Sequence, residues 1–216
     1  MKKMILSAVM LVFAASGRAQ EAGAASPTEH NEWLTTFEAV AVDADLDIKF
    51  VKVPDTEAPK IVYDTKGSYT SKFRAEVKDK TLRISERPDS RRPDRTEVTV
   101  YYNTLQSVSL SGAAAVFEGT VDAVQLDLTL GRKASLTAAF DVKDLRMELT
   151  GGSSATLTGK ASYLTLFAST GRVAASGLEV MSAEVNAQSK AEVSLWITDR
   201  LSLIHISEPT RPRLIS

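Results

Sequence analysis

Apolar and polar residues alternate along short segments of the chain, and the alternation recurs at a nearly constant interval between residues 105 and 200. The segments open at positions 108, 126, 145, 164 and 183, so that successive copies are separated by 18, 19, 19 and 19 residues. In the segment 126–130 (LDLTL) the leucines would face inward and the polar residues outward, because side chains alternate between the faces of a strand. A period of this length is typical of repeat proteins whose coils stack on one another.

Glycine-containing corners follow or close most of these strands, and a second short strand such as 155–157 then returns. Glycine adopts positive φ without steric cost, as a tight corner requires. We therefore predict an all-β, right-handed β-solenoid, a two-sheet superhelix with coils of about 19 residues in which Leu128, Met147 and Leu166 form an inward column. An ordinary antiparallel β-sandwich is the alternative. The predicted turn glycines are Gly112, Gly119, Gly131, Gly151, Gly152, Gly159, Gly171 and Gly177.

The part of the chain from about residue 35 to 104 alternates well but shows no clear period. Residues 77–82 predict a hairpin whose corner is Lys78-Asp79-Lys80. No linker composition separates this irregular half from the regular repeats of residues 105–200. We therefore predict a single domain over residues 35–200.

The first 19 residues have the features of a secretory signal peptide. Lys2 and Lys3 precede an apolar stretch that is too short to span a bilayer, and small residues stand before the expected cleavage point. Residues 20–34 are expected to be a flexible leader. The prediction is an exported protein, in the periplasm, at the outer-membrane surface or outside the cell, without a transmembrane segment after cleavage. The chain contains no cysteine, so it has no disulfides.

Residues 201–216 resemble a translated sequencing-library adapter, and we expect the native sequence to end near Arg200. Because the string also alternates, it could extend the last repeat as a strand. Residues 1–19 and 201–216 carry five basic residues and one acidic residue, which leaves 21 basic and 26 acidic residues between them, a net charge of −5. This balance argues against nucleic acid as a partner.

Reactive groups are scarce. The two histidines, His30 and His205, lie outside the predicted domain, so neither a metal site, a cofactor nor a histidine-dependent catalytic residue is expected. The best enzymatic alternative is a polysaccharide lyase on a pectin-lyase-like scaffold, with Asp141, Asp144 and Arg146 as its charged groups beside Lys143. Charged residues at a solvated corner explain the same cluster.

Two further features suggest ligand contacts. Residues 87–95 contain Arg87, Arg91, Arg92 and Arg95, which could hold a polyanion such as an acidic glycan; a proline-bounded loop with internal Arg–Asp pairing is the alternative. Trp196 follows the inward Leu195 and should face outward, where it could contact a ligand. Trp33 precedes the first long strand and is expected to pack as an N-terminal plug.

The segments 37–50, 77–84, 105–113 and 145–157, in this order, resemble the head GIN domain family of auto-transporter adhesins, secreted β-solenoids of Bacteroidetes-type bacteria. The resemblance covers about residues 35–200. It implies an adhesion or surface role. Together with the scarcity of reactive groups, it predicts a non-catalytic protein that binds a glycan or a protein at the cell surface. A self-assembling structural module, and hence a homo-oligomer, is a further alternative.

Overall fold

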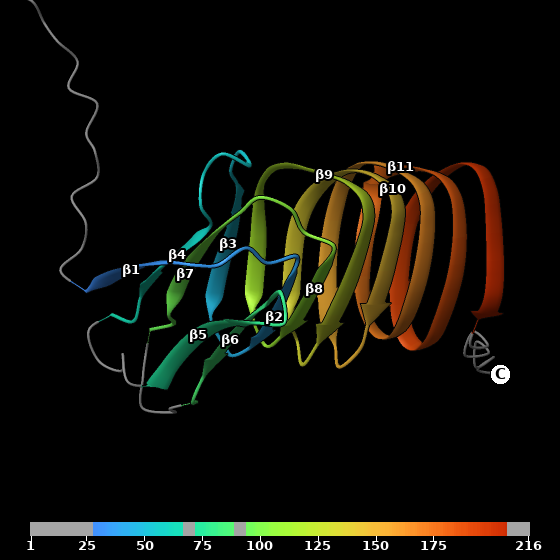
Figure 1. Ribbon diagram of the computed structural model, residues 1–216. Coiled ribbons are helices and arrows are strands. Elements are labelled where there is room, and N and C mark those ends of the chain that lie inside the picture. Colours follow the sequence, from blue (N-terminus) through green and yellow to red (C-terminus); the bar gives the residue numbers. More distant parts are fainter. Residues whose placement is uncertain (1–27, 67–71, 89–93, 207–216) are drawn as a thin grey trace, which may run out of the picture.

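The computed structural model describes residues 28–66, 72–88 and 94–206, with side chains as far as residue 203. Within these residues the fold is all-β, and the strands form one eleven-stranded sheet that curls on itself (Figure 1). Its strands are β1 (Glu29–Trp33), β2 (Ala39–Asp43), β3 (Asp47–Lys52), β4 (Lys60–Asp64), β5 (Phe73–Lys78), β6 (Thr81–Glu86), β7 (Glu97–Tyr102), β8 (Ser107–Ser111), β9 (Ala114–Gly131), β10 (Ser135–Leu149) and β11 (Ser153–Ile206).

The curl arises because the long strands bend and pair on both sides of the molecule. The first part of β9 pairs in parallel with β3, and its last part pairs in parallel with β8. Strand β10 follows the same course beside β9, and β11 follows it beside β10. In Figure 1 the bent ribbons lie side by side from β9 to the C-terminal end of β11. The enclosed space is filled by one cluster of buried apolar side chains.

The predicted inward column is present in the register. Met147 pairs with Leu128 on one side and with Leu166 on the other, and all three side chains are buried. Both pairings join residues 19 positions apart. The segment that opens at Val108 differs. Val108 pairs with Leu128, 20 positions away, and not with Leu126, where the next segment opens.

The longer first interval coincides with a bulge in β9. Between the pairs Val116–Thr137 and Thr120–Ala139, three residues of β9 face a single residue of β10. Gly119 lies in this bulge with φ +77°. Extra residues in one strand of a pair bend that strand locally, so this repeat is longer than the sequence period suggests.

The N-terminal part of the sheet combines parallel and antiparallel pairs. Strand β2 lies between β6 and β8, and β3 lies between β7 and β9, all in parallel. Beyond them, β4 and β1 continue one side of the sheet in antiparallel orientation, and β5 continues the other. The predicted hairpin is confirmed: Lys78 pairs with Thr81, and Asp79 and Lys80 between them have positive φ.

The structure corrects two expectations. The C-terminal end of the expected leader is strand β1, which pairs with all five residues of β4. The stacked rings of His30 and Tyr63 and the hydrogen bond from the Tyr63 hydroxyl to Glu32 hold it there. Not every predicted corner ends a strand either, since Gly159 and Gly171 lie inside β11. The predicted signal peptide and the tail from residue 207 lie outside the described residues.

Candidate functional site

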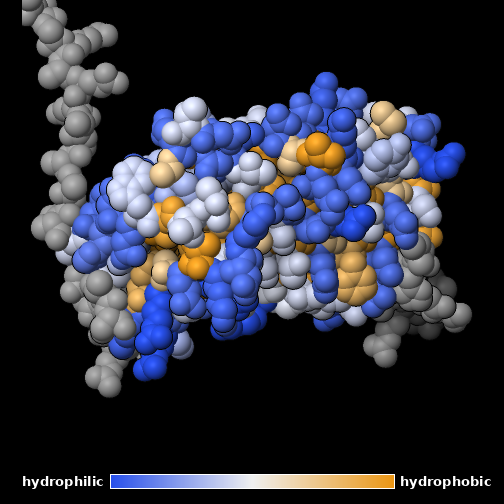
Figure 2. Space-filling model, viewed as in Figure 1, coloured by the Kyte–Doolittle hydropathy of each residue, from blue (hydrophilic) through white to orange (hydrophobic). Residues whose placement is uncertain are grey.

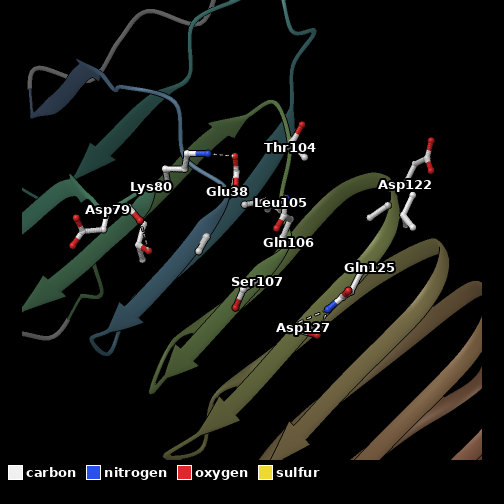
Figure 3. A pocket seen from close by; sticks show the side chains of 14 residues that line it. Glu38, Asp79, Lys80, Thr104, Leu105, Gln106, Ser107, Asp122, Gln125 and Asp127 are labelled. Carbon is white, nitrogen blue, oxygen red and sulfur yellow. Dashed lines mark hydrogen bonds and ion pairs between the residues drawn. The ribbon is translucent and has the colours of Figure 1, made fainter.

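An open groove of about 620 Å³ lies in the described surface, at the end of the sheet where β6, β2 and β8 begin. Four separate segments line it: 38–39 before and within β2, 79–81 at the β5–β6 turn, 104–107 at the start of β8, and 122–127 at the bend of β9. They meet there because the sheet order places β2 between β6 and β8, with β9 next. Figure 3 shows these segments along the groove.

The groove is predominantly acidic. Glu38, Asp79, Asp122 and Asp127 line it together with a single cation, Lys80. The ammonium of Lys80 contacts the Glu38 carboxylate at 2.8 Å, and the Gln125 amide lies 3.5 Å from Asp127. Figure 3 shows Asp122 pointing away from the strands.

The remaining lining supplies hydrogen-bonding groups and apolar surface without an aromatic ring or a histidine: Ala39, Thr81, Thr104, Leu105, Gln106, Ser107, Ala123 and Val124. Val124 is 71% exposed. Among the described residues, no group of three or more histidine, cysteine or carboxylate side chains is arranged to hold a metal ion. The groove is therefore built to make hydrogen bonds and ionic contacts.

Of the arginines predicted to contact a ligand, Arg95 is used by the fold. Its guanidinium contacts the carboxylates of Asp45 and Asp47 and the backbone oxygen of Gly112 at 3.3 Å. Burial, and secondarily the nearby Glu97 carboxylate, raises the pKa of Asp47 above its ordinary value. The carboxylate partners of Arg95 thus come from the segment before and at the start of β3, and not from within its own charged run.

Of the other three predicted arginines, Arg87 is the one that the structure describes. The backbone amide of Arg87 donates to the oxygen of Lys72 at 3.3 Å. Arg91 and Arg92 lie outside the described residues. The ligand role predicted for Arg87, Arg91 and Arg92 therefore stays a prediction.

The residues of the enzymatic alternative lie along β10. Asp141, Lys143 and Arg146 are exposed, and Asp144 is half-buried with its carboxylate 3.5 Å from the Arg146 guanidinium. Arg146 lines a shallow hollow of about 280 Å³ with residues of β9 and β11, but the two aspartates do not. The structure does not bring these groups together in one cleft.

The two tryptophans are both on the surface. Trp196 is 52% exposed and Leu195 is half-buried, which agrees with the predicted orientation. Trp33 is 68% exposed, so the expected N-terminal plug is wrong. Trp33 belongs to β1, an edge strand, and Leu34 after it packs against the core instead. A plug would have required the chain to turn inward at this point, whereas β1 continues the sheet outward from β4.

Among the predicted turn glycines, two kinds of position occur. Gly112, Gly119, Gly151, Gly152, Gly159 and Gly171 have positive φ, whereas Gly131 and Gly177 do not. Arg132, Lys133 and Ser189 also have positive φ although they are not glycine. Backbone geometry at the corners is thus retained where the sequence carries polar side chains.

One protein family matches most of the chain. A sequence profile described as "Putative auto-transporter adhesin, head GIN domain" matches residues 36–207. A search of curated protein sequences found no match. No helix within the described residues is long and apolar enough to cross a membrane.

Several solved structures share the fold. A putative adhesin from Bacteroides fragilis superposes with a TM-score of 0.67 at 15% identity, covering 82% of this chain and 96% of that one. A putative adhesin from Parabacteroides distasonis gives 0.55 at 16% identity, covering 82% and 96%. A putative lipid binding protein from the same species gives 0.57 at 11% identity, covering 81% and 93%.

Proposed function

Because the chain belongs to the putative auto-transporter adhesin, head GIN domain family, we propose that it is a non-catalytic binding protein that holds a glycan or a protein. In this proposal the fold is a right-handed β-solenoid with coils of about 19 residues, and the ligand binds to its outer faces. The observation that carries the proposal is the open groove at the starts of β6, β2 and β8. Its carboxylates, amides and hydroxyls can hydrogen-bond a polar ligand, and no histidine lies among them.

The proposal includes the organisation predicted from the sequence. Residues 1–19 are a signal peptide, residues 35–200 form one domain, and residues 201–216 are not native sequence. The protein then acts in the periplasm, at the outer-membrane surface or outside the cell. On the face drawn in Figure 2, hydrophilic residues predominate and apolar residues form separate patches, which favours a polar ligand over a broad apolar one.

The test is binding by the purified full-length chain on a glycan array and in a pull-down from cell-surface extracts. We expect at least one saturable ligand whose affinity falls about tenfold in Gln106→Ala or Asp127→Asn, since each removes about one polar contact. Asp141→Asn, on the exposed side of β10, is the matched control. Empty results in both assays would contradict a binding role. Shortening of an offered polysaccharide would contradict the non-catalytic part.

A second candidate is end-to-end self-assembly, which the last coil favours. Its inward residues Ala191, Val193, Leu195 and Ile197 are only half-buried, whereas the inward positions of earlier coils are buried. The edge of a terminal strand can pair with another chain when nothing covers it. Sedimentation velocity over a wide concentration range distinguishes the candidates, because assembly predicts a rising sedimentation coefficient. A constant monomer value would count against it.

A further inference from the structure

A row of aromatic and cationic side chains, exposed at Trp33 and half-buried at Lys60 and Tyr101, lies on the outer face of β1, β4 and β7. Trp33 pairs with Lys60, and Lys60 pairs with Tyr101, so the three side chains are neighbours on one face. The Lys60 ammonium lies 5.6 Å from the centre of the Trp33 ring and 4.6 Å from that of Tyr101. The row therefore presents two rings with a cation between them.

The fold itself makes little use of this row. Trp33 is 68% exposed. Lys60 forms no ion pair with a carboxylate in the described part of the chain, although its ammonium interacts with the two rings. Glu32, the residue before Trp33, accepts a hydrogen bond from the Tyr63 hydroxyl. The Lys60 side chain is half-buried, and its ammonium has no carboxylate partner among the described residues.

The position of the row is well fixed despite its exposure. The Leu34 amide donates to the Pro59 oxygen at 2.9 Å, which ties the end of β1 to the start of β4. At the other end of β1, the Thr28 hydroxyl contacts Asp64 at 2.7 Å. Because both ends of the strand pair are held, the Trp33 ring stays beside Lys60. A ligand would meet a preformed surface, which lowers the ordering cost of binding.

The adjacent outward positions add hydrogen-bonding groups. Asn31 pairs with Val62, and Val62 pairs with Thr99, one step along the same face. The Asn31 amide and the Thr99 hydroxyl make no hydrogen bond with the described residues. Trp33 and Tyr101 are two strands apart, about 10 Å at the usual strand spacing. The surface is therefore flat, aromatic at two points, polar beside them and cationic between them.

From this arrangement we infer that the outer face of β1, β4 and β7 binds an acidic glycan, with sugar rings stacked on Trp33 and Tyr101 and a carboxylate or sulfate on Lys60. The C–H face of a sugar packs on an aromatic ring, while its hydroxyls bond amides and hydroxyls beside the ring. An anion on Lys60 forms a charge-assisted hydrogen bond. This inference rests on the proposed binding function and places a glycan site outside the groove.

The experiment uses the two tryptophans of the chain. In the full-length Trp196→Phe variant, Trp33 is the remaining indole and its fluorescence reports stacking directly. The probes are a hexamer of galacturonate, a sulfated heparin hexasaccharide and neutral maltohexaose. We expect saturable changes in Trp33 emission with one or both acidic probes, and affinity at least tenfold weaker for maltohexaose. Added salt should weaken the binding of the acidic probes.

Variants then assign the contacts by calorimetry. We expect Trp33→Ala to lose at least tenfold in affinity, Trp33→Tyr to recover part of it, and Lys60→Gln to abolish the preference for acidic probes. Lys49→Gln, on the same face but paired with Glu118, is the matched control and should change affinity less than twofold. Far-ultraviolet circular dichroism checks that each variant folds; the graded Trp33→Tyr result separates stacking from a merely structural role.

Each other outcome overturns the inference in an identifiable way. If maltohexaose bound as tightly as the acidic probes or more tightly, Lys60 would not select for an anionic group. Acidic probes that bind without changing Trp33 emission, and equally well to Trp33→Ala, would place the site elsewhere and leave the proposed function standing. If no glycan binds but the pull-down captures a protein, this inference fails. The proposed function then still holds, with a protein as the ligand. If neither binds, both fail.

Discussion

Replacing Gly159 by alanine should separate β11 from β10. An added Cβ at Gly159 would lie 2.1 Å from the backbone oxygen of Phe140 and 2.9 Å from its nitrogen. Both atoms belong to the backbone of the neighbouring strand, because Gly159 pairs with Phe140. The φ of Gly159 is +101°, which an L side chain rarely adopts. No side-chain rotation can relieve either conflict.

The expected loss of stability is about 3 kcal/mol. A sparsely populated backbone conformation costs about 2 kcal/mol. Moving the strands apart weakens about two ladder hydrogen bonds, each contributing about 1 kcal/mol net. The lower entropy of the unfolded alanine chain returns about 0.5–1 kcal/mol. Since the free energy of unfolding of a whole domain is only about 5–15 kcal/mol, this substitution removes a large share of the stability.

Two other glycines make matched controls. Gly119 has φ +77° but nothing within 4 Å of an added Cβ, so Gly119→Ala should cost about 1 kcal/mol from backbone conformation alone. Gly177 has no positive φ, and its Cβ would lie 3.1 Å from a Thr158 methyl group, which can rotate. Gly177→Ala should therefore be close to neutral, within about 0.5 kcal/mol.

The assay is urea unfolding followed by circular dichroism and tryptophan fluorescence. With a slope of about 2 kcal/mol per molar urea, the midpoint of Gly159→Ala should fall by about 1.5 M. The slope itself should stay constant if only stability changes. A Gly159→Ala midpoint equal to that of Gly119→Ala would show that the close approach to Phe140 is not tight, and would refute the reasoning.

Three further predictions follow from other contacts. Burial raises the pKa of Tyr63 and of Tyr102 to about 12. The unfolded state therefore releases these protons at lower pH than the folded state does. The stabilisation should be fully present below pH 10 and should be lost between about pH 10 and 12. Tyr102→Phe should reduce this alkaline loss in pH-dependent urea midpoints, and an unchanged profile would contradict it. Lys133→Gly should stabilise the fold by about 0.5 kcal/mol, because Lys133 has φ +62° in the β9–β10 turn; thermal unfolding measures this, and a lower Tm would count against it. Arg95→Ala should cost about 1 kcal/mol, as its carboxylate pairs are partly exposed, and the difference from wild type should shrink in high salt.

The sequence predicted the parts of the fold that depend on local alternation. Leu128, Met147 and Leu166 recur at a fixed interval with polar neighbours, and the register places them together. The Asp79-Lys80 turn was likewise visible, because two alternating segments flank it. In each case the deciding residues are close in the sequence or repeat along it, so that a periodic pattern is enough.

The features that were missed depend on contacts between distant segments. The groove joins segments around positions 38, 80, 105 and 125, and they meet only because β2 lies between β6 and β8. Arg95 reaches carboxylates 48 and 50 positions earlier. Trp33 was misplaced because five residues of a polar leader carry no alternation, yet pairing with β4 makes them a strand. Pairing partners, and not local pattern, decide these positions.

The placement of β2 and β3 between later strands has a consequence for how the molecule can be built. Val40 meets Leu82 on one side and Val108 on the other, and Phe50 meets Val100 and Phe117. During synthesis, β2 and β3 therefore cannot complete their pairing until the later strands on both sides of each have been made. From β10 onward each new rung needs only the one before it. Duplication or loss of a strand segment should accordingly be tolerated near the C-terminal end of the sheet, whereas β2 and β3 should tolerate neither.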